Sequence, residues 1–251
     1  MHGDTRAGIV ARVAERATFV MIHGAWHGGW CWHRLTPLLE SHGMRVIAPD
    51  LPSMGADPTP ASEVSLESWA RFVADIVERE PNGVLVGHSR GGAVISRAAE
   101  LVPDAIRRLV YLSAYLLPDG ESVAAEARRD TASLIAPNMI PARRGVTCLL
   151  RPEVLREAFY GECNDADAAH AIAQLSPEPL KALAAPLSIS AGRFGRVPRA
   201  YIETTRDRAV TLDAQRRMQS ALPCSPVFTL DADHSAFLSQ PEALARILIS
   251  I

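Results

Sequence analysis

One short motif gives the first indication of chemistry in this chain. Residues 87–91, Gly-His-Ser-Arg-Gly, match the pattern G-x-S-x-G, in which a serine hydroxyl stands on a sharp turn between a strand and a helix. The apolar run 84–86 precedes the motif and residues 93–101 have helical character, so both flanks are present. A phosphate-binding loop would need a lysine that this segment lacks. We therefore predict Ser89 as a nucleophile, the alternative being a turn that only connects two elements.

A serine hydroxyl needs a base to accept its proton, and we predict His234 for this role. His234 follows the predicted strand 227–230 and lies in the loop DADHSAF near the C-terminus. This position gives the chain order serine, acid, histidine that accompanies G-x-S-x-G turns. The other seven histidines are expected at the surface (His2, His33, His42, His170), in the loop after the first strand (His23, His27) and inside the motif (His88).

The acid that orients the histidine is expected in the loop after the preceding strand, residues 200–203. Asp207 lies in that loop and is the predicted acid. Asp213 is the rival, but it falls within a predicted helix, where a surface position is the simpler interpretation. Asp233 adjoins His234 and is expected to shape the loop rather than to reach the ring.

Two backbone N–H groups are expected to stabilise the oxyanion of the reaction. We predict those of Arg90, directly after the nucleophile, and of Ala25, in the loop after the first strand. The Arg90 side chain could bind a substrate carboxylate, or reach solvent or a nearby acid. The residues predicted to line the substrate pocket are Gly24, Trp26, His88 and Ser235.

Strands and helices alternate on either side of these residues, which predicts a mostly parallel sheet of about six to eight strands with helices on both faces. The predicted strands are 17–22, 45–48, 84–86, 106–113, 200–203 and 227–230, and the predicted helices include 30–40, 65–80, 93–101, 152–160, 212–222 and 241–249. Residues 17–115 and 191–251 would form this core. The alternation of strands and helices does not continue through residues 116–190, which are predicted to form an inserted, mainly helical cap. Residues 1–16 are predicted to be an N-terminal extension.

The composition excludes several functions. The chain has 251 residues, with 26 basic and 28 acidic side chains and a net charge of −2, so nothing favours a nucleic-acid partner. Its four cysteines are scattered without a CxxC pair, which argues against a zinc ribbon, and we expect no metal or cofactor. Neither a signal peptide nor a membrane-spanning run is recognisable, so we expect a cytoplasmic protein without a membrane partner. The oligomeric state stays open, a homodimer included.

Taken together, these residues resemble the α/β-hydrolase superfamily. The stretch 22–43, IHGAWHGGWCWHRLTPLLESHG, resembles the branch that holds plant methylesterases, hydroxynitrile lyases and bacterial pyrethroid-type carboxylesterases. In the lyases a threonine stands where this chain has Gly24 and a lysine where it has Ser235. The resemblance therefore implies a carboxylesterase that cleaves a small ester through an acyl-enzyme. Lyase, thioesterase or lactonase activity, or a non-catalytic binding role, are the alternatives on the same fold.

Overall fold

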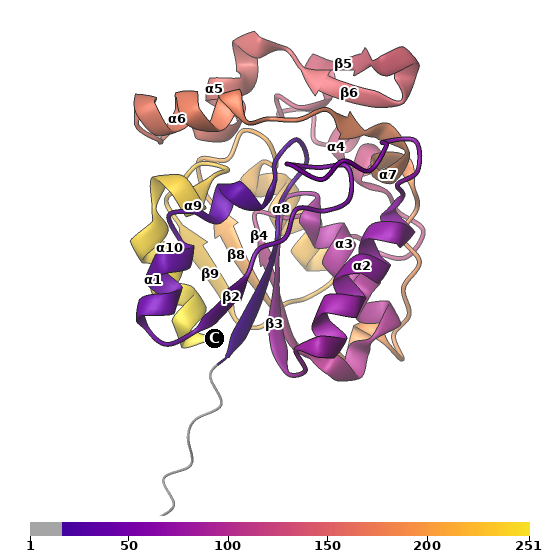
Figure 1. Cartoon of the computed structure of the whole chain (residues 1–251), viewed down its shortest axis with the longest axis vertical. Helices are drawn as coiled ribbons and strands as arrows, with labels where there is room; N and C mark the ends of the chain where they lie inside the picture. The colour runs from indigo at the N-terminus through magenta and orange to yellow at the C-terminus, as the bar shows by residue number, and fades with distance from the viewer. Residues whose placement is uncertain (1–16) are drawn as a thin grey trace, which may run out of the picture.

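Six parallel strands form the central sheet of the computed structural model, which describes residues 17–251 (Figure 1). Their order is β2-β1-β3-β4-β8-β9. The strands are β1 (Thr18–Ile22), β2 (Arg45–Ile47), β3 (Gly83–His88), β4 (Ile106–Leu112), β8 (Arg199–Thr204) and β9 (Val227–Leu230). This arrangement confirms the predicted fold class and lies within the predicted number of strands. The predicted extension, residues 1–16, falls outside the described residues.

The middle strands are apolar because helices cover the sheet on both faces. Every residue of β3 is buried, and Val20, Met21 and Ile22 of β1 have no exposed surface. The register of the β1–β3 pair places Ile22 opposite Gly87. The loops that leave these two strands therefore start side by side, and these are the loops that carry the predicted nucleophile and oxyanion donors.

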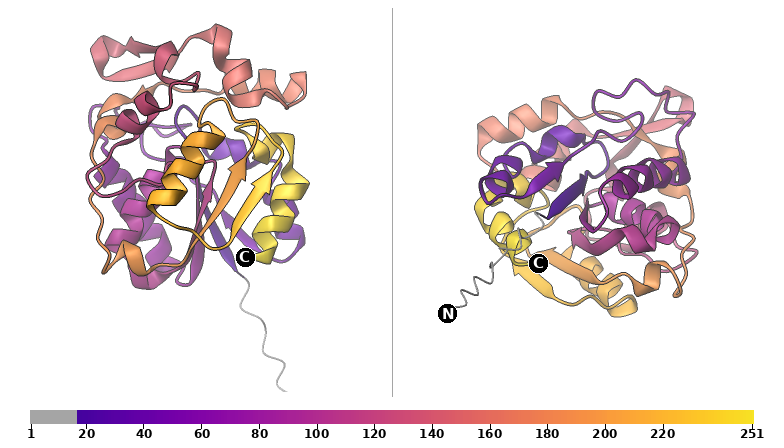
Figure 2. Two further views of the ribbon diagram at one scale, coloured as in Figure 1. Left: turned by 180° about the vertical axis from the view of Figure 1, so that it is seen from behind. Right: turned by 60° about the horizontal axis from the view of Figure 1, so that its bottom comes forward.

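Helices α2 and α3 cover one face of the sheet, and α1 and α10 cover the other (Figure 2). Helix α2 begins with a reciprocal pair of hydrogen bonds between Ser65 and Ser68, and its buried face includes Trp69 and Val73. The core helices are α1 (Thr36–Ser41), α2 (Leu66–Arg79), α3 (Gly91–Leu101), α8 (Leu212–Ala221), α9 (Ala236–Ser239) and α10 (Pro241–Ser250), with 3-10 turns η1 (Gly29–Trp32), η2 (Pro103–Ala105) and η5 (Phe194–Arg196). Among residues 17–251, no helix has the length and apolar character needed to span a bilayer.

The helix predicted over residues 30–40 is divided in two. The first part is the short turn η1, and α1 starts only at Thr36, with Pro37 in its first turn. Proline lacks the N–H that a continuous helix would use, and its ring clashes with the carbonyl one turn earlier. Pro37 therefore fits the start of a helix and interrupts one that would begin at residue 30.

Residues 116–190, called the cap segment below, hold elements that lie above the core at the carboxyl end of the sheet (Figure 1). They are α4 (Val123–Arg129), η3 (Ala136–Asn138), β5 (Met139–Ala142), η4 (Arg143–Gly145), β6 (Thr147–Leu150), α5 (Pro152–Tyr160), α6 (Asp165–Ala173), β7 (Glu178–Pro179) and α7 (Leu180–Ala184). None of these strands joins the central sheet. The boundaries of the cap stay a prediction.

The cap segment also contains a small antiparallel sheet, β5-β6-β7, that the sequence did not predict. Its strands have two to four residues, and β7 ends in a proline, so neither length nor alternation identifies them. In this sheet Cys148 pairs with Glu178. Both residues contact the loop after β1, as described next.

Candidate active site

The predicted nucleophile stands on a strained turn between β3 and α3. Ser89 has a φ of +53°, a left-handed conformation that non-glycine residues rarely adopt. A Cβ at Gly87 would lie 2.8 Å from the carbonyl carbon of Gly91, and one at Gly91 would lie 2.6 Å from the carbonyl oxygen of Ile22. The two glycines of the motif are therefore required by close backbone packing. The packing holds Ser89 at the carboxyl end of β3, in line with the sequence-based expectation for this turn.

The loops after β8 and β9 bring Asp207 and His234 together. Nδ1 of His234 donates a hydrogen bond of 2.8 Å to Oδ2 of Asp207, and the two side chains are almost fully buried. The other carboxylate oxygen accepts from the backbone N–H groups of Ala209 and Val210, at 2.7 and 2.8 Å. The hydroxyl of Thr204 donates to Oδ2 at 3.1 Å. The carboxylate is thus fixed from several sides, and Nδ1 carries the proton.

The two rival aspartates lie in the positions that the sequence suggested for them. Asp213 is exposed on α8. Asp233 accepts hydrogen bonds from the N–H of Ser235 and the hydroxyl of Ser239, and also from the N–H of Glu162 in the cap segment. Asp233 therefore braces the histidine loop against the cap segment.

Nε2 of His234 is buried and has no hydrogen-bond partner among residues 17–251. The hydrogen bond expected between this atom and the Ser89 hydroxyl is not formed. Such bonds are often long in an unliganded site and tighten when substrate binds. The ring of His234 packs against that of His88, with centroids 4.4 Å apart, so it lies beside the residue that precedes Ser89.

The two predicted oxyanion donors are also free. The N–H groups of Ala25 and Arg90 make no hydrogen bond within the described part of the chain. The carbonyl oxygen of Gly24, on the same peptide unit as the Ala25 N–H, accepts from Nδ1 of His23 at 2.9 Å and from Nη2 of Arg90 at 3.0 Å. Two donors to one carbonyl fix the orientation of that peptide.

The Arg90 guanidinium is buried and paired with an acid from the cap segment. Its Nε lies 3.0 Å from Oε1 of Glu178, and both side chains have at most 1% of their surface exposed. The guanidinium also stacks on the indole of Trp69, 4.2 Å from the ring centroid. Burial raises the pKa of the Glu178 carboxyl, and the Arg90 charge opposes that rise. Of the three alternatives for the Arg90 side chain, the structure has the one with a nearby acid.

Trp26 is the second residue of the site with a strained backbone, at a φ of +61°. Its N–H donates to Oε2 of Glu178 at 3.0 Å, and its indole Nε1 donates to the carbonyl of Cys148 at 3.1 Å. The two acceptors are a cross-strand pair of the small sheet. Neither hydrogen bond could be predicted from the sequence, because Glu178 and Cys148 lie more than a hundred positions from Trp26 and no local pattern connects them.

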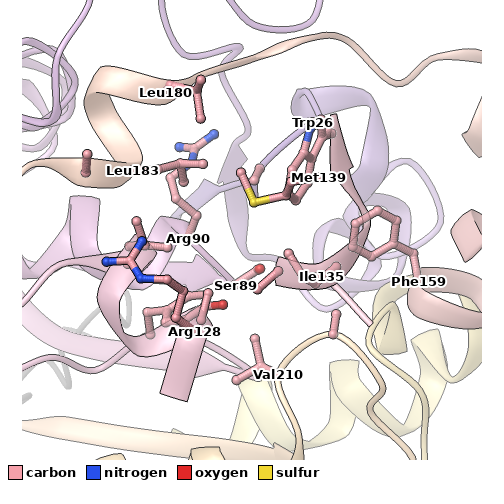
Figure 3. Close-up of a pocket in the computed structure, with 18 residues that line it drawn as sticks. Trp26, Ser89, Arg90, Arg128, Ile135, Met139, Phe159, Leu180, Leu183 and Val210 are labelled. Carbon is pink, nitrogen blue, oxygen red and sulfur yellow. The ribbon is translucent and has the colours of Figure 1, made fainter. Parts of the chain in front are cut away.

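A cavity of about 290 Å³ opens beside Ser89 (Figure 3). Its walls are mostly apolar and come from the core and the cap segment, including Trp26, Ile135, Met139, Phe159, Leu183 and Val210. Of the residues predicted for the pocket, Trp26 lines it, whereas Gly24, His88 and Ser235 do not. His88 is instead fully buried and donates from Nε2 to the carbonyl of His234 at 3.0 Å.

Three buried histidines surround the site, and burial favours their neutral form. His23 donates from Nδ1 to Gly24 and accepts at Nε2 from the N–H of Leu51. His27 donates from Nδ1 to the Ala25 carbonyl at 2.7 Å, and its Nε2 accepts from the Tyr160 hydroxyl at 2.8 Å. Burial lowers the pKa of His27 to about 3 and the pKa values of His23 and His88 well below the usual range. Among the described residues, no group of three or more His, Cys, Asp or Glu side chains is arranged to hold a metal ion.

Comparison with known proteins finds relatives along almost the whole chain. The profile described as "Alpha/beta hydrolase family" matches residues 19–247. A pyrethroid hydrolase of Sphingobium wenxiniae is 35% identical, over 91% of this chain and 85% of its own length. Putative methylesterase 11, chloroplastic, of Arabidopsis thaliana is 32% identical, over 100% of this chain and 67% of its own. The crystal structure of tomato methylketone synthase I complexed with 2-tridecanone superposes with a TM-score of 0.84 at 26% identity, covering 94% of this chain and 97% of that one.

The three buried histidines make stability sensitive to acid. Below pH about 6.5 the unfolded chain binds protons at these residues, whereas folded His27 does so only near pH 3. The contribution of these histidines to the free energy of unfolding is therefore fully present above pH 6.5 and is lost as the pH falls below it, by about 1.4 kcal/mol per pH unit for each group that the unfolded chain protonates and the folded chain does not. Urea unfolding at a series of pH values below 6.5 measures this slope, which is the change in the free energy of unfolding per pH unit. His27→Gln is expected to reduce this slope by about 1.4 kcal/mol per pH unit, because the unfolded variant binds one proton fewer at this position. An equal slope in wild type and the His27 variant would show that His27 is not a source of the acid sensitivity.

Proposed function

The chain belongs to the alpha/beta hydrolase family, as its motifs predicted, and from this premise we propose that it hydrolyses small carboxylic esters through an acyl-enzyme on Ser89. Relatives named as a methylesterase and a pyrethroid hydrolase support a carboxylesterase. In the proposed reaction Ser89 is the nucleophile, His234 the general base and Asp207 the residue that orients the base. The N–H groups of Ala25 and Arg90 hold the oxyanion.

One observation carries this proposal. The 2.8 Å hydrogen bond from Nδ1 of His234 to Asp207 leaves the lone pair on Nε2, the atom that must accept a proton from serine. Nε2 has no partner among residues 17–251, so no group there competes with serine for it. A binding protein that had lost its chemistry would have no need for this tautomer or for a serine on a strained turn.

Acylation begins when Oγ of Ser89 attacks the ester carbonyl carbon and its proton moves to Nε2 of His234. The carbonyl oxygen becomes an oxyanion and accepts hydrogen bonds from the two free backbone N–H groups. The α3 N-terminus, which starts one residue after Arg90, adds a favourable dipole. His234 then returns the proton to the leaving alcohol, the carbon–oxygen bond of the ester breaks, and Ser89 retains the acyl group.

Deacylation repeats these steps with water. His234 removes a proton from a water molecule, the resulting hydroxide attacks the acyl carbon, and the same N–H groups hold the second oxyanion. Return of the proton to Oγ frees Ser89 and releases the carboxylic acid. Asp207 stays ionised and stabilises the imidazolium in both halves of the reaction.

The cavity indicates the chemical character of the ester group that is recognised. Its lining is aliphatic and aromatic, and the charged residues that contribute to it are Arg90 and Arg128. Arg90 is paired with Glu178, and Arg128 is exposed on α4. We therefore expect an ester whose acyl or alcohol group is small and apolar, and whose affinity comes from burial of that group.

Two positions weigh against the lyase alternative. A Cβ at residue 24 would lie 2.8 Å from Cβ of Ser89, so a threonine there would not fit without a shift of the turn. Ser235, which stands where the lyases carry a lysine, is fully buried and offers no cation. Thioesters and lactones react through the same kind of tetrahedral intermediate as esters. The same nucleophile, base and oxyanion donors would therefore serve all three substrate classes.

The proposed cytoplasmic location remains a prediction, and so do the absence of nucleic-acid and membrane partners and of a cofactor. The substrate is proposed to be a small ester, in keeping with the names of the relatives. Recombinant protein assayed with aryl, methyl and thio esters would rank these classes.

Substitutions at the three side chains test the mechanism. Ser89→Ala and His234→Ala are expected to lower kcat by about 10⁴- to 10⁶-fold, and Asp207→Asn by less, because oxyanion stabilisation and binding survive. Steady-state hydrolysis of p-nitrophenyl butyrate measures this, with melting curves to verify folding. The exposed Asp213→Asn is the matched control and should keep its activity. Ester hydrolysis that survives Ser89→Ala would refute the mechanism.

The lyase alternative has its own test. Without a cation after His234 and without a hydroxyl at position 24, the protein should not release cyanide from mandelonitrile faster than buffer alone. A colorimetric cyanide assay on wild type and Ser89→Ala measures this. Cyanide release that exceeds the buffer rate and disappears in Ser89→Ala would replace the esterase proposal.

A further inference from the structure

The peptide between Gly24 and Ala25 is held by side chains that the proposed reaction does not use. Its N–H is one of the two proposed oxyanion donors, and its carbonyl accepts from His23 and from Nη2 of Arg90, at 2.9 and 3.0 Å. A carbonyl that accepts hydrogen bonds polarises its peptide, which strengthens the N–H at the other end as a donor. The direction of that N–H depends on the same two contacts.

The next peptide is held at both ends as well. The Ala25 carbonyl accepts from His27 at 2.7 Å, and the Trp26 N–H donates to Oε2 of Glu178 at 3.0 Å. The Ala25 N–H is therefore the donor of these two peptides that is left without a partner among the described residues. The left-handed backbone of Trp26 requires such restraints, because a bulky residue rarely adopts it unaided.

Arg90 and Glu178 connect these peptides to two other parts of the molecule. Arg90 directly follows Ser89, and its guanidinium rests on Trp69 and contacts Glu178. Glu178 lies in β7 of the cap segment, paired across the small sheet with Cys148, whose carbonyl holds the Trp26 indole. The nucleophile turn, the oxyanion loop and the cap segment thus meet at one buried ion pair.

We propose that Arg90 and Glu178 are positioning residues that orient the Ala25 N–H toward the oxyanion and so couple the cap segment to catalysis. The proposal rests on the esterase function proposed above. Neither the guanidinium nor the carboxylate contacts the reacting atoms in this role, although Arg90 contributes to the cavity wall. Arg90 acts through the Gly24 carbonyl, and Glu178 acts through the Trp26 N–H.

The main competing role for Arg90 is a cation that binds an anionic substrate. The structure disfavours it, because the guanidinium is 1% exposed and already faces a carboxylate. A substrate carboxylate there would displace Glu178 and leave that buried acid without its partner, at a large cost. The two roles predict different kinetics and can be separated.

Two double variants form the test, because removing one partner of a buried ion pair can unfold a protein. The first, Arg90→Met with Glu178→Met (the Met/Met variant), removes both charges and both contacts to the loop. The second, Arg90→Met with Glu178→Gln (the Met/Gln variant), also removes both charges, but its neutral amide oxygen can still accept from the Trp26 N–H. Arg97→Met is the control, since the half-buried Arg97 pairs with Glu67 at 2.7 Å and donates to the carbonyl of Ser188 at 2.8 Å, contacts that do not involve the oxyanion loop.

The measurements are kcat and KM for p-nitrophenyl butyrate and the inhibition constants of a trifluoromethyl ketone and its methyl ketone analogue. The trifluoromethyl ketone adds to the serine and forms an oxyanion, whereas the methyl ketone only fills the cavity. The Met/Met variant should lose about 10- to 100-fold in kcat at nearly constant KM, less than the loss of a whole oxyanion donor. Its trifluoromethyl ketone affinity should fall in parallel, and its methyl ketone affinity should not change.

The Met/Gln variant should recover part of the lost kcat, and Arg97→Met should resemble wild type. A folded Met/Met variant with a kcat within twofold of wild type would overturn the proposal. The proposal would also be overturned if the Met/Met variant showed an unchanged kcat and a higher KM only for an anionic ester such as p-nitrophenyl hemisuccinate. That result would assign Arg90 to substrate binding. Ser89→Ala, assayed in parallel, distinguishes failure of the positioning proposal from failure of the esterase function. If Ser89→Ala keeps its activity, the esterase function itself is wrong.

Discussion

The hydrogen bond between Nδ1 of His234 and Asp207 is the interaction on which the chemistry proposed for this site depends. It determines which ring nitrogen is a base, and it does so in a buried environment where the 2.8 Å contact is not weakened by water. The surrounding structure keeps it in place. Backbone N–H groups of Ala209 and Val210 fix the carboxylate, and Asp233 fixes the loop of the histidine against the cap segment.

The opposite side of the site depends on strained backbone. Ser89 and Trp26 both have left-handed φ values, a conformation that costs about 1 to 3 kcal/mol at each residue. The strain persists because β1 and β3 are neighbours in a buried parallel sheet and because glycines admit close packing around the turn. At Trp26 the cap segment supplies the restraint through Glu178 and Cys148. The cap segment therefore forms a wall of the cavity and also holds the loop that faces the nucleophile.

The features of the fold and site that could be predicted from sequence have local signals. The turn around Ser89 combines a motif with its flanks, and the core strands are short runs rich in apolar and β-branched residues. Asp207 is predicted from its place after a strand, and the structure places it within hydrogen-bonding distance of His234. The features that could not be predicted depend on contacts between distant residues. Arg90 and Glu178 are 88 positions apart, and the small sheet has strands too short to show a pattern. His88 was expected in the pocket, but burial under the histidine loop placed it in the core.

The most direct test of the central claim is intact-protein mass spectrometry of a rapidly quenched reaction with a p-nitrophenyl ester. An acyl-enzyme mechanism predicts a transient species heavier than the enzyme by one acyl group, and peptide mapping should locate that group on Ser89. The species should accumulate in an early burst and decay as the acid is released. Turnover without any acylated enzyme, or an acyl group on another residue while Ser89→Ala remains active, would contradict this mechanism.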